Sequence, residues 1–333
     1  MVRSHIFHIQ WISLFMSTYS PSRESPLSPR TKSDKLLDSG FVGLTRILAL
    51  AIAFVLLTIC VQVGLQAIPA MKEFGFGFLS ETAWNPVEGR ELYGVLPQVY
   101  GTLVSSFIGL LIAVPIGVGT AVLLSENLLP LSVRTVLVFL VELLAAIPSV
   151  VYGVWGIFVL IPIITNIGNW LYSNFAWIPI FSTPPRGPGM LAAGVILAIM
   201  TLPIITAISR DALISVPRNL REASVGLGAT RWETILKVII PAAFSGIVSA
   251  VMLALGRAMG ETMAVTMLIG NANKISSSVF APSNTVASLL ANQFAEASGL
   301  QISALMYAAL VLFFLTLLVN ILAELVVMRV RKI

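Results

Sequence analysis

The sequence predicts an all-α integral membrane protein, and three observations lead to this fold class. First, 57% of the 333 residues are hydrophobic and only 11% are charged, with a mean hydropathy of +0.94, whereas about a quarter of the residues of a soluble domain are charged. Second, six apolar stretches are long enough to cross a bilayer as helices, which takes about 20 residues each. Third, the basic residues gather on one side of the membrane that these stretches imply.

The hydrophobic stretches define six expected spans. They are Ile47–Ile68, Val99–Leu124, Thr135–Ile164, Met190–Ile208, Ala242–Ile269 and Ile302–Met328. Pro115, Pro148 and Pro203 lie inside spans, where neighbouring helices or waters can satisfy the carbonyl groups that a proline frees. Each is interpreted as a simple kink, or alternatively as a bend that shapes a pathway.

The distribution of Lys and Arg predicts the orientation of the chain. If the N-terminus is cytoplasmic, fifteen of the 20 basic residues lie on the cytoplasmic side. Lys72, Arg90, Arg186 and Lys274 lie opposite, and Arg257 lies within the membrane. This bias predicts that both termini are cytoplasmic. It also accounts for the net charge of +5 without a nucleic-acid partner.

The chain is expected to hold one membrane domain behind a short tail. Residues 1–43 are predicted to form a disordered cytoplasmic tail, because Pro21–Gly40 is rich in Ser, Pro and charge. Met16, followed by STYSPS, resembles a native start, and a mis-assigned upstream start is a hypothesis. Residues 44–333 are expected to form the membrane domain.

Residue chemistry argues against an enzyme. Cys60 is the only cysteine and lies in an apolar run, where a packed thiol is expected, and zinc-ligand spacing is absent. Both histidines, His5 and His8, fall in the tail, and no H-E-x-x-H motif occurs. We therefore expect no catalytic residues, no metal and no cofactor.

One polar stretch, SVPRNLREASVGLGATRWETILKVIIP, interrupts the hydrophobic pattern before the fifth span. Pro217 suits the start of a first short helix, and Gly226 and Gly228 break it. Thr230 and Glu233 have the spacing of a capping box that starts a second helix. We expect a basic cytoplasmic elbow, with a solvated connector as the alternative.

The elbow resembles the EAA loop of ABC importer permeases, whose pattern is E-A-A, three residues, G, nine residues and I-x-L-P. Here the pattern begins at Glu222 and Ala223, continues with Gly228 six residues after Glu222, and ends at Pro241, the expected start of span five. The chain departs from the pattern at Ser224, Val238 and Ile240, which replace Ala, Ile and Leu. The resemblance implies a type I ABC importer permease fold, with residues 217–241 as its coupling loop.

In that family the loop forms a helix that sits in a groove on a cytoplasmic ATPase subunit. The resemblance therefore implies that Glu222, Ala223, Gly228 and Pro241 couple the chain to an ATPase dimer. Glu222 would supply a charge at the helix start, for the helix dipole or for a basic residue of the ATPase. The chain has no G-x-x-x-x-G-K-[ST] element, so ATP hydrolysis is expected in another polypeptide.

Three longer stretches resemble the C-type permeases of Pst phosphate importers. They are LYGVLPQVYGTLVSSFIGLLIAVPIGVGTAVLLSE, VELLAAIPSVVYGVWGIFVLIP and LGRAMGETMAVTMLIGN. The resemblance implies inorganic phosphate as substrate, a second related permease subunit, an extracytoplasmic phosphate-binding protein and a bacterial cytoplasmic membrane. A permease for another oxyanion, such as sulfate or molybdate, is the main alternative, and an ion-coupled secondary carrier is a more distant one.

Arg257 and Glu261 stand out because they interrupt the fifth span near its expected midpoint. Each charge costs about 2.5–3.5 kcal/mol at the bilayer centre, so both must face protein or water. Their i, i+4 spacing would put them on one helix face, beside a Gly256 and Gly260 ridge that permits close helix contact. In one interpretation they form a structural ion pair. In the other they line the substrate pathway, and the Arg257 guanidinium binds the anion through two parallel hydrogen bonds.

Two further carboxylates lie in expected spans. For Glu142 in span three, a partner inside the bundle is the expectation. Glu324, near the inner end of span six, is expected to snorkel or to pair with Arg329.

Overall fold

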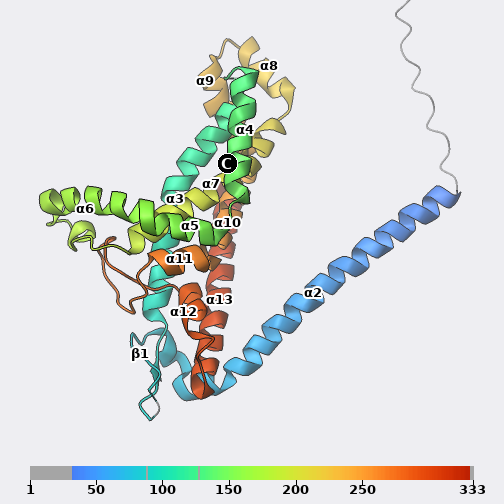
Figure 1. Cartoon of the computed structure of the whole chain (residues 1–333). Coiled ribbons are helices and arrows are strands. Elements are labelled where there is room, and N and C mark those ends of the chain that lie inside the picture. Colours follow the sequence, from blue (N-terminus) through green and yellow to red (C-terminus); the bar gives the residue numbers. More distant parts are fainter. Residues whose placement is uncertain (1–31, 88, 127, 331–333) are drawn as a thin grey trace, which may run out of the picture. The chain divides into compact units, whose positions relative to one another are not determined.

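Helices dominate the computed structural model, which describes residues 32–87, 89–126 and 128–330 (Figure 1). By contacts the chain divides into two units, one up to Ile59 and one from Cys60 onwards. Six helical segments are long and apolar enough to cross a membrane. They are Leu36–Leu79, Leu96–Ser125, Ser149–Phe175, Met190–Ile214, Arg231–Gly260 and Gly299–Leu325. The predicted number of spans is therefore confirmed for the described residues, while the bounds of the first, third and fifth spans differ from the prediction.

The first helix, α2, runs over Lys32–Phe74 and contains Pro69. It begins earlier than expected, so residues 32–43, which the composition placed in a disordered tail, are helical. Residues 1–31, including the candidate start at Met16 and both histidines, lie outside the described residues. The apolar run expected as the first span, Ile47–Ile68, lies wholly inside this helix, which extends beyond it at both ends.

A small hairpin follows α2. A 3-10 turn, Gly75–Leu79, leads to strands β1 (Trp84–Asn85) and β2 (Leu92–Tyr93), which pair antiparallel with Trp84 opposite Tyr93. Aromatic contacts hold this region to the C-terminal helix α13 (Gly299–Val330), since Phe78 stacks on Tyr307 with ring centroids 4.4 Å apart. Such pairs add about 0.5–1.5 kcal/mol beyond burial.

Helices α3 (Leu96–Ser125) and α7 (Met190–Ile214) pack against each other along most of their lengths. Glycines permit this close approach: a Cβ on Gly194 would lie 2.4 Å from Ile108 Cγ2, and one on Gly117 would lie 2.8 Å from Ile205 Cγ2. Small residues let helix backbones approach in this way in membranes. In contrast, a Cβ on Gly256 or Gly260 would meet no atom within 4 Å, so the predicted close contact at that ridge does not occur within the part of the chain that the structure describes.

The third span begins later than predicted. Helix α4 (Leu131–Ala146) ends before Pro148, and a new helix starts at Ser149 as α5 (Ser149–Trp155), a π turn (Gly156–Leu160) and α6 (Ile161–Phe175). Ile147 is extended because the residue before a proline disfavours the helical conformation. Figure 1 shows α5 and α6 running across α4. The expected continuous span Thr135–Ile164 is thus wrong.

The fifth span also differs from the prediction. Helix α9 (Arg231–Thr234), a π turn (Ile235–Ile239) and α10 (Ile240–Gly260) form one continuous helical segment. Pro241 therefore lies inside a helix rather than at its start, because the wider π turn before it accommodates the missing N–H and the ring. The helix ends at Gly260, not at Ile269.

Three short helices complete the chain. Helix α8 (Arg218–Gly226) precedes α9, α11 (Met263–Leu268) follows α10, and α12 (Val286–Gln293) packs against α13. In Figure 1, α8 and α9 lie at one end of the bundle and β1 lies at the opposite end. This arrangement separates the elbow from the hairpin by the length of the spans.

Candidate functional site

The elbow folds as its sequence predicts. Pro217 precedes the first residue of α8, and Gly228 has a φ of +87°, a left-handed conformation that favours glycine. The predicted capping box is present: the Thr230 backbone N–H donates to Glu233 Oε2 at 3.0 Å, and the Thr230 side chain accepts from the Glu233 N–H. The elbow is therefore a defined helix–turn–helix rather than a loose connector.

A buried hydrogen bond joins the two arms of the elbow. The Ser224 and Thr234 hydroxyl groups lie 2.9 Å apart, and both residues are buried. The chain has Ser224 where the EAA pattern has Ala. The structure accounts for this departure, because Ser224 supplies a partner to a threonine hydroxyl that would otherwise be buried alone.

The other residues of the pattern take different positions. Glu222 and Ala223 are exposed on α8, and Pro241 lies within the fifth span. Glu222 is not in the first turn of α8, so the interpretation that its charge serves the helix start is wrong. Its carboxylate instead faces outward.

Large apolar side chains are exposed around the elbow. Leu227 is 90% exposed, Val225 is 60% exposed and Trp232 is 58% exposed. Exposed apolar side chains that gather in one place are typical of a surface that another protein covers.

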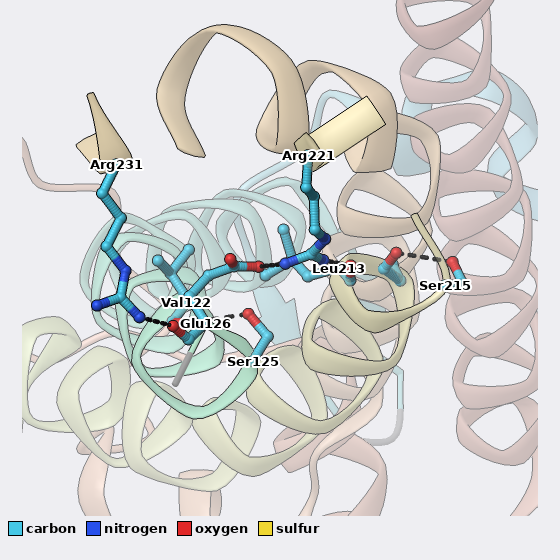
Figure 2. A network of polar contacts seen from close by, with 8 residues as sticks. Val122, Ser125, Glu126, Leu213, Ser215, Arg221 and Arg231 are labelled. Carbon is cyan, nitrogen blue, oxygen red and sulfur yellow. Dashed lines mark hydrogen bonds and ion pairs between the residues drawn. The ribbon is translucent and has the colours of Figure 1, made fainter. Parts of the chain in front are cut away.

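Glu126, at the end of α3, binds both arms of the elbow (Figure 2). Its carboxylate forms an ion pair with Arg221 of α8, and its backbone carbonyl accepts a hydrogen bond from Arg231 of α9. Arg221 also donates to the Leu213 carbonyl at 2.7 Å. Sequence reasoning missed Glu126, since it lies 95 residues from Arg221 and no motif marks it.

Arg257 borders a cavity of about 830 Å³ between α7, α10 and α13. The cavity is lined by Ile204, Ser249, Met252, Leu253, Gly256, Arg257, Asn320, Ile321 and Glu324. Arg257 lies in the last turn of α10, not at the midpoint of a span, and its side chain is exposed. The absence of a side chain at Gly256 leaves room beside it.

Glu261 does not share a helix face with Arg257. It follows the end of α10, where its backbone is extended, and its Oε1 accepts a hydrogen bond from the Ala264 N–H of α11 at 3.4 Å. Among the described residues no ion pair joins Arg257 to Glu261, so the predicted i, i+4 pair is wrong. The helix ends at Gly260, and this turns the carboxylate toward the next helix instead.

The polar groups that accompany Arg257 come from α13. Glu324 lines the same cavity. Of the two expectations for this residue, pairing with Arg329 is not observed, since among the described residues no ion pair joins the two side chains. Asn320 also lines it, and the buried Asn320 Oδ1 has no hydrogen-bond partner. Sequence reasoning did not single out Asn320, because one amide in an apolar span carries no spacing signal. Glu142 is exposed on α4, so the structure gives no support to the expected partner inside the bundle.

Known proteins resemble this chain over most of its length. A phosphate transport system permease protein PstC of Mesorhizobium japonicum is 43% identical over 93% of this chain and 96% of its own length, and one of Pasteurella multocida is 43% identical over 86% and 91%. A solved bacterial alginate ABC transporter chain is 15% identical with a TM-score of 0.58, covering 87% of this chain and 94% of that one, which supports the fold alone. The family model for binding-protein-dependent transport system inner membrane components matches residues 97–332. With its six apolar helices, this chain therefore belongs to that family of multi-pass membrane transport proteins.

Proposed function

We propose that this chain is the permease subunit of an ATP-driven phosphate importer, in which it forms half of the transmembrane pathway. The observation that carries the proposal is the 43% identity, over 93% of the chain, to a relative named as a phosphate transport permease. Alternating access would be driven by a separate ATPase, because the chain contains no phosphate-binding loop motif of its own.

The elbow supports an ATPase dimer as the cytoplasmic partner. It offers a rigid shape, through its capping box and the Ser224–Thr234 bond, together with exposed Leu227 and Trp232. Glu222 and Ala223 lie on the exposed side of α8, where a partner's groove would contact them. Gly228 provides the turn, and the continuous helix through Pro241 would carry the motion into α10.

Arg257 is proposed to line the substrate pathway. No carboxylate in the described chain forms an ion pair with it, so its guanidinium is available for two charge-assisted hydrogen bonds to an oxyanion. Glu324 and Asn320 border the same cavity. Glu324 can accept a hydrogen bond from a protonated phosphate, whereas the Glu261 carboxylate accepts a hydrogen bond from α11 instead. The exposed side of Arg257 would face the second permease subunit, because a charge within the membrane must face protein or water.

The proposal includes an orientation in a bacterial cytoplasmic membrane. Arg218, Arg221 and Arg231 favour a cytoplasmic elbow and cytoplasmic termini, with residues 44–333 as the permease domain and residues 217–241 as its coupling loop. The β1–β2 hairpin lies at the other end of the bundle (Figure 1). An extracytoplasmic phosphate-binding protein would deliver the anion on that side.

Reconstitution tests this function directly. The chain would be purified with the second permease, the ATPase and the binding protein encoded beside it, and placed in vesicles loaded with ATP or with a non-hydrolysable analogue. Uptake of radiolabelled phosphate that needs ATP hydrolysis is the expected result. Uptake of sulfate or molybdate in preference to phosphate would favour the other-oxyanion permease. Uptake driven by an ion gradient without ATP would indicate a secondary carrier.

A further inference from the structure

We infer that Glu126 is a positioning residue that fastens the elbow to α3, so that movement of the elbow reaches the α3–α7 pair. We call Glu126, Arg221 and Arg231 the Glu126 clamp. The inference rests on the proposed function, since it assigns a role in the coupling between ATP hydrolysis and transport.

The clamp holds both arms of the elbow at one point. Glu126 directly follows the last residue of α3, and its side chain binds Arg221 while its backbone carbonyl binds Arg231 (Figure 2). Arg221 also binds the Leu213 carbonyl near the end of α7. The ends of α3 and α7 are therefore joined to α8 and α9 through two guanidinium groups.

The Glu126 carboxylate is well shielded from solvent. Its side chain is 8% exposed, and that of Arg221 is 24% exposed. Water competes weakly for such a charge-assisted pair, unlike for a surface pair. If Arg221 were pulled away, a nearly buried carboxylate would lose its partner, which is costly. The clamp therefore resists separation of α3 from the elbow.

Apolar packing also joins these elements, but it constrains them in a different way. Ala121 and Val122 of α3 belong to the same buried cluster as Ile235 and Ile239 of the π turn. Apolar contacts are non-directional and permit sliding, whereas the planar guanidinium fork of Arg221 sets an orientation. The clamp therefore fixes the orientation of the elbow relative to α3, which apolar packing alone does not fix.

The three helices that meet at the elbow receive its movement by different routes. Helix α10 is continuous with α9, and α7 connects to α8 through only Ser215 to Pro217. Helix α3 is not connected to the elbow through neighbouring residues of the chain. The clamp joins the two through polar contacts instead. Glycines allow α3 and α7 to pack closely and move as a pair. If the clamp no longer held α3 to the elbow, the elbow could move without rotating this pair.

The test compares Glu126→Gln with Asp211→Asn in the reconstituted full complex. Asp211 is an exposed acid of α7 close to the elbow, so its variant removes the same charge without touching the clamp. Phosphate uptake and ATP hydrolysis are measured in the same vesicles, and subunit stoichiometry is checked by size-exclusion chromatography. For Glu126→Gln we expect normal assembly and ATP hydrolysis, with phosphate transported per ATP reduced about fivefold or more, the lower end of typical coupling effects.

Further variants separate positioning from a merely structural role. Arg221→Gln and the double variant Glu126→Gln with Arg221→Gln should show the same loss as the single variant, because one interaction is removed in each case. Glu126→Asp should restore part of the ratio. An unchanged ratio in Glu126→Gln, or fewer complexes with a normal ratio, would overturn the inference. If the wild-type complex imports sulfate rather than phosphate, the proposed substrate is wrong, and the same ratio measured with sulfate decides the role of the clamp.

Discussion

The hydrogen bond between Ser224 and Thr234 makes a quantitative prediction about the elbow. Thr234→Val keeps the shape of the side chain but leaves the buried Ser224 hydroxyl without its partner, which lies 2.9 Å away. An unsatisfied buried hydroxyl costs about 1–3 kcal/mol. Because both residues are less than a tenth exposed, at 9% and 5%, water cannot easily replace the lost partner. We therefore expect Thr234→Val to lower the free energy of unfolding by about 1–3 kcal/mol.

The double variant Ser224→Ala with Thr234→Val should recover most of this stability. It removes both hydroxyl groups, and replacing both partners by apolar groups of similar shape is nearly neutral. It also recreates the E-A-A form of the pattern. The four proteins form a double-mutant cycle whose interaction energy should be about 1–2 kcal/mol. Trp232, which is exposed next to this pair, provides a fluorescence signal for equilibrium unfolding in mixed micelles.

Two results would show that the Ser224–Thr234 hydrogen bond does not stabilise the elbow. If Thr234→Val is as stable as the wild type, the buried hydroxyl has another partner and the bond is not needed. If the double variant is as unstable as the sum of the single variants, the loss comes from packing rather than from the hydrogen bond. Either result would remove the explanation given for Ser224.

Three other substitutions test the remaining parts of the proposal. Arg257→Ala should abolish phosphate uptake while the complex still assembles, because no other basic residue among those described lines its cavity; lost assembly would instead indicate a structural role, and normal uptake would refute the pathway assignment. Glu222→Ala should weaken ATP-driven uptake without changing the stability of the isolated chain, since the side chain is exposed; wild-type uptake would count against its coupling role. Gly194→Val should destabilise the α3–α7 contact by about 1–3 kcal/mol through overpacking, since its Cβ would lie 2.4 Å from Ile108 Cγ2; this is read from thermal stability in detergent, where an unchanged melting temperature would contradict the packing argument.

Much of the fold follows from local sequence. Long apolar runs determine the number of spans, because each must satisfy its backbone polar groups internally and only a helix can do so in lipid. The elbow was also predictable in detail, since Pro217, Gly228 and the Thr230–Glu233 pair act through their own backbone neighbours. These features depend on residues close in the chain, so the sequence alone contains the information.

The predicted ion pair between Arg257 and Glu261 could not be judged from neighbouring residues alone. Gly260 is compatible with a small-residue ridge in a continuing helix and with a helix end, and only the packed chain distinguishes them. Because the helix ends there, Glu261 turns to α11, and Arg257 instead shares a cavity with Glu324 from a span more than 60 residues away in the sequence. The π turn that carries the helix through Pro241 likewise depends on how the elbow packs.

By itself, the sequence determined the membrane class, the number of spans and the local shape of the elbow, because hydrophobicity, proline, glycine and capping residues act over a few positions. The tertiary structure decided which polar side chains come together. Glu126 forms an ion pair with Arg221, and Arg257 lines the same cavity as Asn320 and Glu324. These contacts depend on how helices far apart in the sequence pack together, and the residues next to a side chain in the sequence do not determine that packing.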